Sequence, residues 1–594
     1  MDLHLTAAQP ADEEKAAVDF VVGQVGQAVS PARSPRRDML LPVLHAIQAR
    51  IGWISPGALN YASARLDTAP AEVHGVASFY DMFALSPRPP VVAHVCDDIA
   101  CIVRGADTLC AELEKKLGPE GVTWVRSPCL GLCERAPASL VIAAGEAPHE
   151  TVLAPAESDA VMAALRDAQP VADAQPSLPQ SGEPQLRLLR RIGKVDPSSL
   201  DDYRSLGGYE ALTRALEMGP DAIVREVIES RLLGRGGAAF PTGKKWEVVA
   251  SQRHLGRTHY VICNADESEP GTFKDRVVME GDPFAILEGM TIAALAVGAH
   301  RGYIYIRGEY PLATRRLVHA IDAARSAGLL GDNILGRGLR FDIELRRGAG
   351  AYICGEETAL FNSIEGYRGE PRNKPPFPTQ AGLFRQPTVV NNVETLINIP
   401  EIILGGGAAY ARIGAGNSAG YRLFCLSGHV VHPGVYEVPF GATLRKVIDL
   451  AGGVGGNGRL QAVLLGGAAG SFVTPNELDT PLTFEGTRAI GATLGSGVIM
   501  LFDDSVNLAR ILLRIAAFFR HETCGQCVPC RIGVVRQEEA IERLIGGRPL
   551  GSITDEINTL REMGQAMRDA SICGLGQTAS SALESTLHRW SLFS

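Results

Sequence analysis

The sequence lacks the features of membrane, secreted and nucleic-acid-binding proteins. Its best apolar run, Met290 to Ala299, is far shorter than the roughly 20 residues that span a bilayer. The first residues run into an acidic stretch and lack the basic-then-apolar order of a signal peptide. The net charge of −9 argues against general binding to nucleic acid. We therefore expect a cytoplasmic protein with no membrane span and no nucleic-acid partner.

Length and composition indicate an α/β protein of several domains. At 594 residues the chain exceeds the size of a single hydrophobic core. Its 65 glycines favour tight turns and ligand sites lined by backbone. The apolar pattern divides the chain into five segments, over residues 1–166, 167–186, 187–415, 416–505 and 506–594.

The first two segments are a small domain and a linker. Residues 12–85 have apolar side chains at helical spacing, and short apolar runs after residue 90 predict strands around a helix at 105–117. That order, with cysteines at strand ends, indicates a thioredoxin-like or ferredoxin-like α/β unit. Residues 167–186 contain four prolines and a repeated Asp-Ala-Gln-Pro, which predict an extended, semi-rigid linker.

The remaining segments are a large α/β unit, a small α+β unit and a helical end. In the large unit, strands are expected at 260–262, 303–306 and 341–345, and helices at 220–232, 284–298 and 311–327. This alternation predicts a sheet with helices on its faces. From Asn507 onward the apolar residues recur at helical spacing, which predicts a helical bundle.

Four cysteines near the C-terminus are arranged for a metal centre. Cys524, Cys527 and Cys530 lie two residues apart from one another, and Cys573 is the only later cysteine. Three thiolates converging from one loop suit a [4Fe–4S] cluster, with the fourth ligand supplied from a distance. A zinc site, or cysteines without a metal, are the alternatives at this point.

A second set of four cysteines follows the strands of the first domain. Cys96 and Cys101 form one closely spaced pair, and Cys129 and Cys133 form another. Two such pairs separated by a helix-length stretch are able to hold a [2Fe–2S] cluster. Zinc or a loop disulfide are the alternatives, although disulfides are rare inside cells. The four other cysteines are expected to be small buried apolar residues.

Glycine-rich loops in the large unit predict a phosphate-bearing cofactor. The loop from Gly234 to Phe240 has the spacing G-x-G-x-x-A but follows a helix, so it fails the context of a standard dinucleotide fingerprint. Its amides still suit a phosphate, and Arg235, Lys244 and Lys245 add positive charge nearby. A plain turn explains this loop alone equally well.

Three more polar loops follow expected strands, where α/β sheets place their ligands. They begin at Asn264, Gly348 and Asn391. A solvated loop is the alternative for the first, and a helix cap is favoured for the third when it is considered alone. Together the four loops suggest a cofactor with a phosphate and a heterocycle.

The motifs GRGGAAFPTGKKW, CNADESEPGTFKDR, GAGAYICGEE, KPPFP, VNNVET and CGQCVPCR give the chain a family resemblance. From about Gly234 to Gly576 it resembles the NADH-binding, FMN-containing subunit of respiratory complex I and the diaphorase subunits of NAD-dependent formate dehydrogenases and NAD-reducing hydrogenases. The region before the linker resembles their thioredoxin-like [2Fe–2S] subunit. The resemblance implies a Rossmann-like FMN/NADH domain over 187–415, an SLBB-type ubiquitin-like domain over 416–505, and a helical [4Fe–4S] bundle over 506–594.

The resemblance also implies roles for individual residues. FMN would be held by residues of all four loops: Gly234, Arg235, Gly236, Gly237, Lys245, Asn264, Asp266, Glu267, Tyr352, Gly355, Glu356, Asn391, Asn392 and Thr395. NADH would lie over the flavin, with adenine against Phe240 and Phe377 beside Lys374. Glu269 and Glu357, expected to be the catalytic residues, would contact the nicotinamide end. Val248 stands where relatives often carry an aromatic residue, which implies weaker adenine stacking.

The implied chemistry joins two kinds of electron carrier. NADH delivers a hydride, iron–sulfur clusters take one electron at a time, and FMN is able to exchange both ways. The segment from Met567 to Ala579 is most similar to β-subunits of metal-dependent formate dehydrogenases, so the expected partner is a large molybdenum- or tungsten-bis-pterin subunit with iron–sulfur clusters. A hydrogenase diaphorase, a complex I subunit, or an electron-wire subunit with a decayed nucleotide site are the alternatives.

Overall fold

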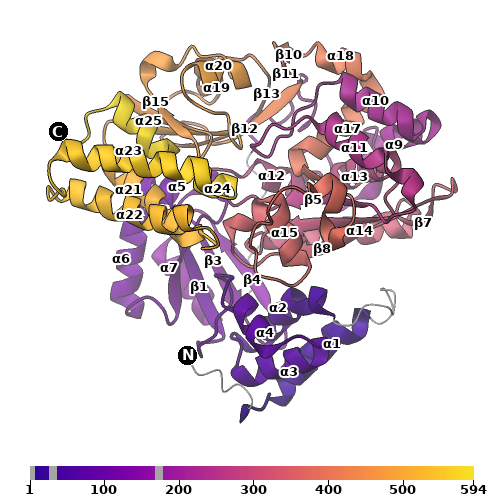
Figure 1. Cartoon of the computed structure of the whole chain (residues 1–594), viewed down its shortest axis with the longest axis horizontal. Coiled ribbons are helices and arrows are strands. Elements are labelled where there is room, and N and C mark those ends of the chain that lie inside the picture. The colour runs from indigo at the N-terminus through magenta and orange to yellow at the C-terminus, as the bar shows by residue number, and fades with distance from the viewer. Residues whose placement is uncertain (1–6, 26–35, 168–177, 594) are drawn as a thin grey trace.

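The structure is a computed structural model that describes residues 7–25, 36–167 and 178–593. The domains of the chain pack against one another (Figure 1). The N-terminal helices and the first sheet lie at the bottom, the large α/β unit on the right, and the C-terminal helices on the left. No helix in the described ranges is long and apolar enough to cross a bilayer.

Four helices open the chain, as their apolar spacing predicts. They are α1 (Asp12–Val25), α2 (Leu40–Ile51), α3 (Pro56–Leu66) and α4 (Pro70–Ala77). Leu40, Leu44 and Ile47 of α2 are fully buried, so the periodic face is the one that packs. Ser55 caps α3 by accepting a hydrogen bond from the Ala58 amide, and Pro56 occupies the first helical position.

The next unit has the order of a thioredoxin-like fold. Its four-stranded sheet runs β2-β1-β3-β4, with β1 parallel to β2 and antiparallel to β3. The elements are β1 (Val91–Cys96), α5 (Ile99–Val103), α6 (Ala106–Leu117), β2 (Trp124–Ser127), β3 (Ser139–Ala143), β4 (His149–Leu153) and α7 (Ser158–Asp167). The predicted strands and helix are present, and β4 and α7 complete the unit.

The segment expected to be a linker ends against another domain. Residues 168–177 lie outside the described residues. Farther on, Leu186 is buried, and the Gln180 side chain accepts a hydrogen bond from the Glu437 amide. The Glu437 carboxylate in turn accepts the backbone N–H groups of Arg187, Leu188 and Leu189. Residues 180–189 are therefore fastened to strand β13 (Gly434–Pro439) rather than extended through solvent.

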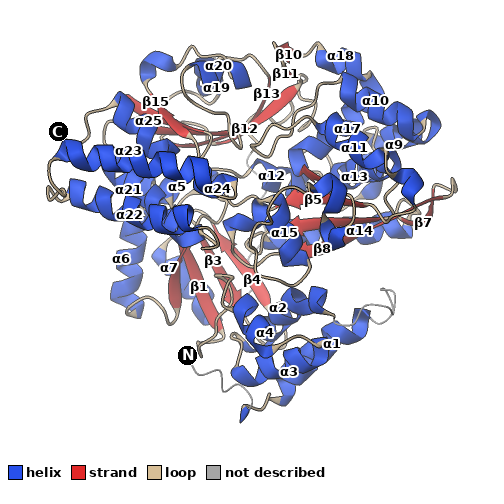
Figure 2. Cartoon of the chain, viewed as in Figure 1, coloured by secondary structure: helices blue, strands red, loops and turns tan. Residues whose placement is uncertain are grey.

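The large unit is a mostly parallel sheet with helices on both faces (Figure 2). The order β7-β8-β6-β5-β9 has only β7 antiparallel, and the strands are β5 (Tyr260–Ala265), β6 (Arg301–Ile306), β7 (Gly331–Ile334), β8 (Leu339–Arg347) and β9 (Thr388–Asn392). The helices are α8 (Leu200–Ser205), α9 (Glu210–Met218), α10 (Pro220–Glu229), α11 (Thr242–Ala250), α12 (Lys274–Gly281), α13 (Pro283–Val297), α14 (Pro311–Ser326), α15 (Glu357–Ile364), α16 (Pro378–Ala381), α17 (Val393–Gly405) and α18 (Gly407–Ala411).

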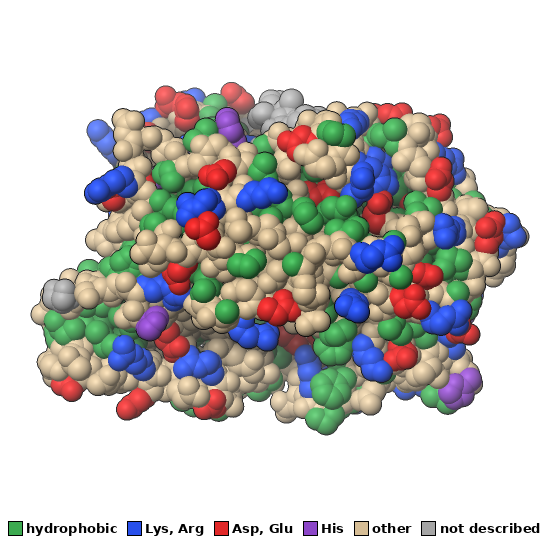
Figure 3. All heavy atoms as spheres, turned by 90° about the horizontal axis from the view of Figure 1, so that it is seen from above, with side chains coloured by type: hydrophobic (Ala, Val, Ile, Leu, Met, Phe, Trp, Pro, Cys, Tyr) green, Lys and Arg blue, Asp and Glu red, His purple; other side chains and the backbone are tan. Residues whose placement is uncertain are grey.

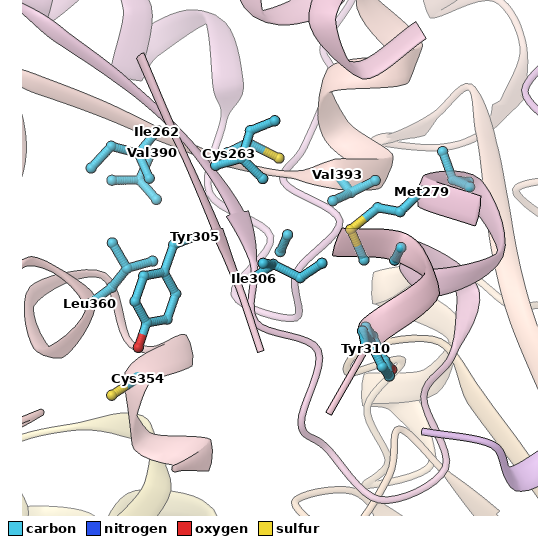
Figure 4. Close-up of a cluster of buried hydrophobic side chains, with 14 of the residues drawn as sticks. Ile262, Cys263, Met279, Tyr305, Ile306, Tyr310, Cys354, Leu360, Val390 and Val393 are labelled. Atoms are coloured by element: carbon cyan, nitrogen blue, oxygen red, sulfur yellow. The ribbon is translucent and has the colours of Figure 1, made fainter. Parts of the chain in front are cut away.

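The core of this unit explains its apolar strands. Figure 4 shows Ile262 and Tyr305 on one face of the sheet and Cys263 and Ile306 on the other. Because both faces are covered, successive residues of β5 and β6 are buried, as parallel strands require. Helix α13 is buried over almost all of its length, which explains why it contains the best apolar run of the chain.

Two smaller units follow. A small hairpin, β10 (Gly414–Ala415) and β11 (Ser418–Ala419), precedes a five-stranded sheet of order β13-β12-β16-β14-β15. Its elements are β12 (Tyr421–Gly428), β13 (Gly434–Pro439), α19 (Leu444–Leu450), β14 (Leu460–Leu465), β15 (Ser471–Val473), α20 (Phe484–Ala489) and β16 (Val498–Asp503). Helices α21 (Leu508–Glu522), α22 (Val528–Ile545), α23 (Ile553–Ala570), α24 (Gly574–Thr578) and α25 (Ser581–Arg589) end the chain.

The surface seen from above mixes charges of both signs. Figure 3 shows Lys and Arg side chains interspersed with Asp and Glu, without a large area of one sign on that face.

We predict that Glu437→Ala destabilises the protein by about 2–4 kcal/mol, because it leaves buried amide groups without a partner. Urea unfolding measures this as a lower midpoint. Glu120→Ala, which removes a surface ion pair with Arg126, is the control and should change stability by less than about 0.5 kcal/mol. Equal midpoints for the two variants would contradict the fastening of residues 180–189.

Candidate functional site

The four predicted loops meet at the carboxyl end of the parallel sheet. The Asn264 side chain, at the end of β5, donates to the Gly355 carbonyl over 2.8 Å. The Arg235 amide donates to Thr395 Oγ1 over 2.9 Å, which joins the first loop to the last. A Cβ placed on Gly236 would lie 3.2 Å from the Asn392 side chain. The loops, scattered over 160 residues of sequence, therefore form one cradle.

Glycines keep this cradle open. Gly237 has φ +110°, a backbone conformation that residues with a side chain rarely adopt. A Cβ placed on Gly355 would first meet the Asp266 carbonyl, at 3.5 Å. A Cβ placed on Gly237 would lie 3.7 Å from the Gly495 backbone, so this glycine is required by its backbone conformation rather than by a clash. This arrangement fits a flavin phosphate and ring.

The charge beside the first loop differs from the prediction. The buried Arg235 guanidinium turns away from the cradle, donates to the Ala419 carbonyl over 2.8 Å, and lies over the Phe440 ring. Lys244 forms an exposed ion pair with Glu247 on α11. Of the three cations predicted to add positive charge near the loop, Arg235 and Lys244 therefore have other partners. Lys245 remains, because its Nζ donates to the Val390 carbonyl inside the cradle.

Two acidic residues follow the third loop. Glu356 caps α15 by accepting the amides of Thr358 and Ala359, and it pairs with Lys374 at 2.8 Å. Glu357 pairs with both Lys245 and Lys374. Burial raises the pKa of Glu357, but the two lysines outweigh it, so the pKa lies below its ordinary value.

The pKa values of Asp266 and Glu269 are shifted in the direction opposite to that of Glu357. Burial raises the pKa of each to about 7. The Glu269 carboxylate accepts from Tyr352 Oη over 2.6 Å and from the Ala469 amide, which belongs to the β14–β15 turn, over 2.7 Å. These two carboxyl groups therefore gain or lose a proton near neutral pH.

Glu267 lies next to them in sequence but points elsewhere. Its carboxylate accepts the amides of Asp275 and Arg276 at the start of α12, and also the Tyr310 hydroxyl. Burial raises its pKa to about 8. Because successive residues alternate in direction here, the Glu267 side chain stabilises α12 rather than facing the cradle.

The fourth loop, which begins at Asn391, both caps a helix and contributes side chains to the cradle. Asn392 caps α17 by accepting the Glu394 amide, and it donates to Asp275 over 2.6 Å. Asn391 accepts from Trp246 Nε1 over 2.8 Å. Trp246 and Asp275 were not predicted as site residues, although both lie within the motifs that carry the resemblance.

The two aromatic rings predicted to contact the adenine are both exposed. Phe240 is 52% exposed and Phe377 is 53% exposed, unusual values for large apolar side chains. Lys245 Nζ lies 5.8 Å from the centre of the Phe240 ring. Exposed aromatic rings are suited to stacking with the adenine of a nucleotide, and neighbouring lysines are suited to binding the phosphates of that nucleotide.

The first cysteine set is gathered in the thioredoxin-like unit. Cys96 ends β1, Cys101 lies in α5, and Cys129 and Cys133 lie in the loop after β2; all four are buried. Cys129 Sγ lies 3.4 Å from Cys133 Sγ. The thiols of Cys133 and Cys96, with the Arg307 charge, hold the pKa of Cys129 well below its ordinary value. A thiolate is the form that ligates iron.

The second set is gathered by the ends of three helices. Cys524 follows α21, Cys527 caps the start of α22, Cys530 lies in its first turn, and Cys573 precedes α24. A Cβ placed on Gly576 would lie 2.8 Å from Cys530 Cβ, so the two distant segments touch. Burial raises the pKa of Cys530 to about 12 and that of Cys573 to about 11. Ionising these buried thiols is therefore unfavourable, and the positive charge of bound iron would offset the free-energy cost.

A single metal ion fits these cysteines less well. In the described residues, no group of three or more His, Cys, Asp or Glu side chains is placed to hold one ion. The cysteines within the described ranges form no disulfide. An iron–sulfur cluster spans a larger space between its ligands than zinc does. Cys110, Cys263, Cys354 and Cys425 are buried and apart from both sets, as expected.

Contacts tie both cysteine sets to the cradle. The Tyr352 amide donates to Glu522, two residues before Cys524, over 2.8 Å, and its ring packs against Phe518 of α21. Arg307, which follows β6, donates to the carbonyls of both Cys129 and Glu267. The three sites therefore lie in different domains that are joined by direct contacts.

Comparisons with known families agree with this geometry. Residues 27–169 match a thioredoxin-like [2Fe-2S] ferredoxin, and residues 227–401 match the Nuo51 FMN-binding domain. Residues 423–469 match an SLBB domain, and residues 510–591 match the iron–sulfur binding region of an NADH-ubiquinone oxidoreductase. The fold predicted from the motifs is confirmed.

Individual relatives share much of the chain. The NADP-reducing hydrogenase subunit HndC of Solidesulfovibrio fructosivorans is 45% identical over 68% of this chain and 81% of its own. An NADH-quinone oxidoreductase subunit of Aquifex aeolicus is 46% identical over 68% of this chain and 92% of its own. A chain in the air-oxidized NAD+-reducing [NiFe]-hydrogenase structure has TM-score 0.79 and 31% identity, over 94% of this chain and 93% of that one.

The fold and sites therefore define an iron–sulfur flavoprotein module that exchanges electrons with NAD(H). The chain belongs to the family of NADH-quinone oxidoreductase subunits with the Nuo51 FMN-binding domain and their hydrogenase relatives, and it carries a thioredoxin-like [2Fe–2S] domain as well. Its cofactors are FMN, a [2Fe–2S] cluster and a [4Fe–4S] cluster, and it is an NAD-dependent oxidoreductase module.

We predict that Gly237→Ala weakens FMN binding about tenfold, because a Cβ at φ +110° strains the loop by about 1–2 kcal/mol. The flavin-to-protein ratio of the purified variant measures this. Gly256→Ala is the matched control, since Gly256 also has positive φ but lies in an exposed turn before β5, at the opposite end of the sheet. Full flavin content in Gly237→Ala would contradict the assignment of the cradle.

Proposed function

We propose that this chain is the NAD(H)-binding subunit of an NAD-dependent formate dehydrogenase, in which a partner subunit oxidises formate. The observation that carries the electron-converting role is the convergence of four glycine-rich and acidic loops between two four-cysteine sets. When bound, FMN accepts a hydride and passes electrons on one at a time.

The residues of the cradle position the nucleotide in this proposal. Phe240 and Phe377 provide exposed rings for the adenine, and Lys374 provides a cation for the phosphates. Glu269 and Glu357 stand at the nicotinamide end, and their task is alignment, because hydride transfer depends on placing two atoms correctly. Val248 is half-buried on α11 and offers no second ring.

The [4Fe–4S] site lies where a partner is able to approach. Val528 is 72% exposed and Ile532 is 53% exposed on α22, while Ile572 is exposed just before Cys573. Apolar side chains gathered beside a redox site mark an interaction surface. We assign this surface to the partner that exchanges single electrons with the chain.

The choice of formate rests on sequence similarity in one segment. Residues 567–579, whose sequence motif led us to expect a formate dehydrogenase β-subunit, form the end of α23, the Cys573 turn and α24. The test is purification of the native complex with metal analysis. Molybdenum or tungsten with a pterin in a large partner supports formate, and a partner without either contradicts it.

An NAD-reducing hydrogenase is the second candidate. The likeness to the chain of the NAD+-reducing [NiFe]-hydrogenase structure extends over nearly all of both chains, so it includes the [2Fe–2S] domain. Nickel in the purified complex would support this candidate. A complex I-type NADH dehydrogenase would purify with neither metal. A decayed, electron-wire subunit would purify without flavin. The cytoplasm is the compartment that we propose for each of these complexes.

The raised pKa of Glu269 predicts a pH-dependent affinity for NADH. Because its pKa is about 7, the carboxyl becomes ionised as pH rises through 7 and then adds a negative charge beside a ligand that is itself negatively charged. We expect KM for NADH to rise as pH increases through 7, and Glu269→Gln to abolish this rise. Steady-state kinetics with an artificial acceptor measure it, with Glu247→Gln on the outer side of α11 as control. The same rise in Glu269→Gln would refute the assignment.

The position of the [4Fe–4S] cluster predicts a variant that separates two reaction steps. Cys527→Ala should leave the reduction of FMN by NADH intact but block electron exit, because a cluster ligand is lost. Stopped-flow absorbance follows the first step, and reduction of the partner follows the second. Cys110→Ala removes a buried cysteine outside both sets and should retain both steps. A normal exit rate in Cys527→Ala would overturn the proposed route.

A further inference from the structure

Three arginines from outside the thioredoxin-like domain reach its cysteine loops. Arg307, after β6, donates to the Cys129 carbonyl over 2.5 Å. Arg276 of α12 donates to the Gly131 carbonyl over 2.9 Å, and Arg514 of α21 donates to the Asp97 carbonyl over 3.0 Å. All three acceptors are cluster ligands or lie within two residues of one, so the loops are held by cations of other domains.

Arg307 differs from the other two in its surroundings. It is only 3% exposed, and its guanidinium stands between the Cys129 carbonyl and the Glu309 carboxylate, since one terminal nitrogen donates to both. Its other terminal nitrogen donates to the Glu267 carbonyl over 2.7 Å. The positive end of the Arg307–Glu309 pair therefore faces the cysteine loop, and the negative end lies on the other side.

The other charges near this loop are more nearly balanced. Arg276 is paired with Glu134 and with Glu280, both buried. Arg514 lies near Asp97 and Asp98. Each of these arginines forms ion pairs with two carboxyl groups, whereas Arg307 forms an ion pair with one among the described residues. Of the three arginines, Arg307 thus has the fewest carboxyl groups that neutralise its positive charge.

We propose that Arg307 raises the reduction potential of the [2Fe–2S] cluster, acting as a positioning residue from the FMN-binding domain. Reduction adds one electron to a site that already carries four thiolates. A cation held close by in a buried, low-dielectric place stabilises that added charge more than it stabilises the oxidised site. Hydrogen bonds and charges outside the ligands are known means of tuning cluster potentials.

The test is a redox titration of the purified, cluster-loaded protein, followed by electron paramagnetic resonance of the reduced [2Fe–2S] signal. For Arg307→Gln we expect a reduced-to-oxidised ratio about tenfold smaller at a fixed potential, a fall of about 59 mV for a one-electron couple. Arg307→Lys keeps the charge and should restore most of the ratio. An unchanged potential in Arg307→Gln would overturn the proposal.

Glu309→Gln separates this electrostatic role from a structural one. Removing the carboxylate leaves the Arg307 charge uncompensated, so the potential should rise, opposite to the change in Arg307→Gln. A loosened loop would instead move both variants in the same direction, and that result would refute the proposal. If Arg307→Gln fails to hold the cluster, the reduction potentials of Glu309→Gln and Arg307→Lys, each compared with that of the unmodified protein, still test the proposal.

Arg191→Gln is the matched control. Arg191 is also buried and ion-paired, with Asp282 at 2.8 Å, but it lies over the Tyr203 ring in the large α/β unit. Its substitution should reduce stability without changing the potential of the cluster. A fall in potential equal to that of Arg307→Gln would show a general loss of folding and count against the assignment.

Discussion

Buried ion pairs across domain boundaries hold the redox sites in place. Arg276 of the FMN-binding domain and Glu134 of the thioredoxin-like domain form such a pair at 2.5 Å, and both side chains are almost completely buried. Removing one partner of a buried pair costs about 3–5 kcal/mol, because the other charge is left without compensation. The two domains are therefore fixed to each other, which keeps the distance between their cofactors constant.

A second buried group of charges lies beneath the cradle. Glu394 of α17 is surrounded by Lys274, Arg235 and Arg422; although burial raises its pKa, these cations hold it below its ordinary value. Arg422 belongs to the SLBB domain and donates to the Arg235 carbonyl. This hydrogen bond joins the first glycine loop to the SLBB domain and restrains its backbone.

The N-terminal unit also supports the cradle. The amides of Asp81 and Met82 donate to the carbonyls of Gly350 and Ala349, just before Tyr352. The loop that carries Glu356 and Glu357 is therefore shaped by a segment from much earlier in the chain. Because the helical segment and this loop belong to one chain, the contact forms within the molecule.

Much of this architecture could be predicted from the sequence, because its signals are local. The cysteine spacings, the loops after strands and the helical periodicity each depend on neighbouring residues, and the structure contains those elements. The directions of Arg235 and Glu267 could not be predicted, because their partners, Ala419 and the start of α12, become neighbours only after folding. The packing of residues 180–189 on Glu437 was missed for the same reason.

The central claim is that one chain joins a two-electron carrier to one-electron carriers at fixed distances. Anaerobic titration with NADH, followed together by flavin absorbance and electron paramagnetic resonance, tests it most directly. The account predicts that NADH bleaches the flavin and generates the signal of at least one reduced iron–sulfur cluster in the same protein. Clusters that dithionite reduces but NADH leaves oxidised, with the flavin bleached, would contradict it.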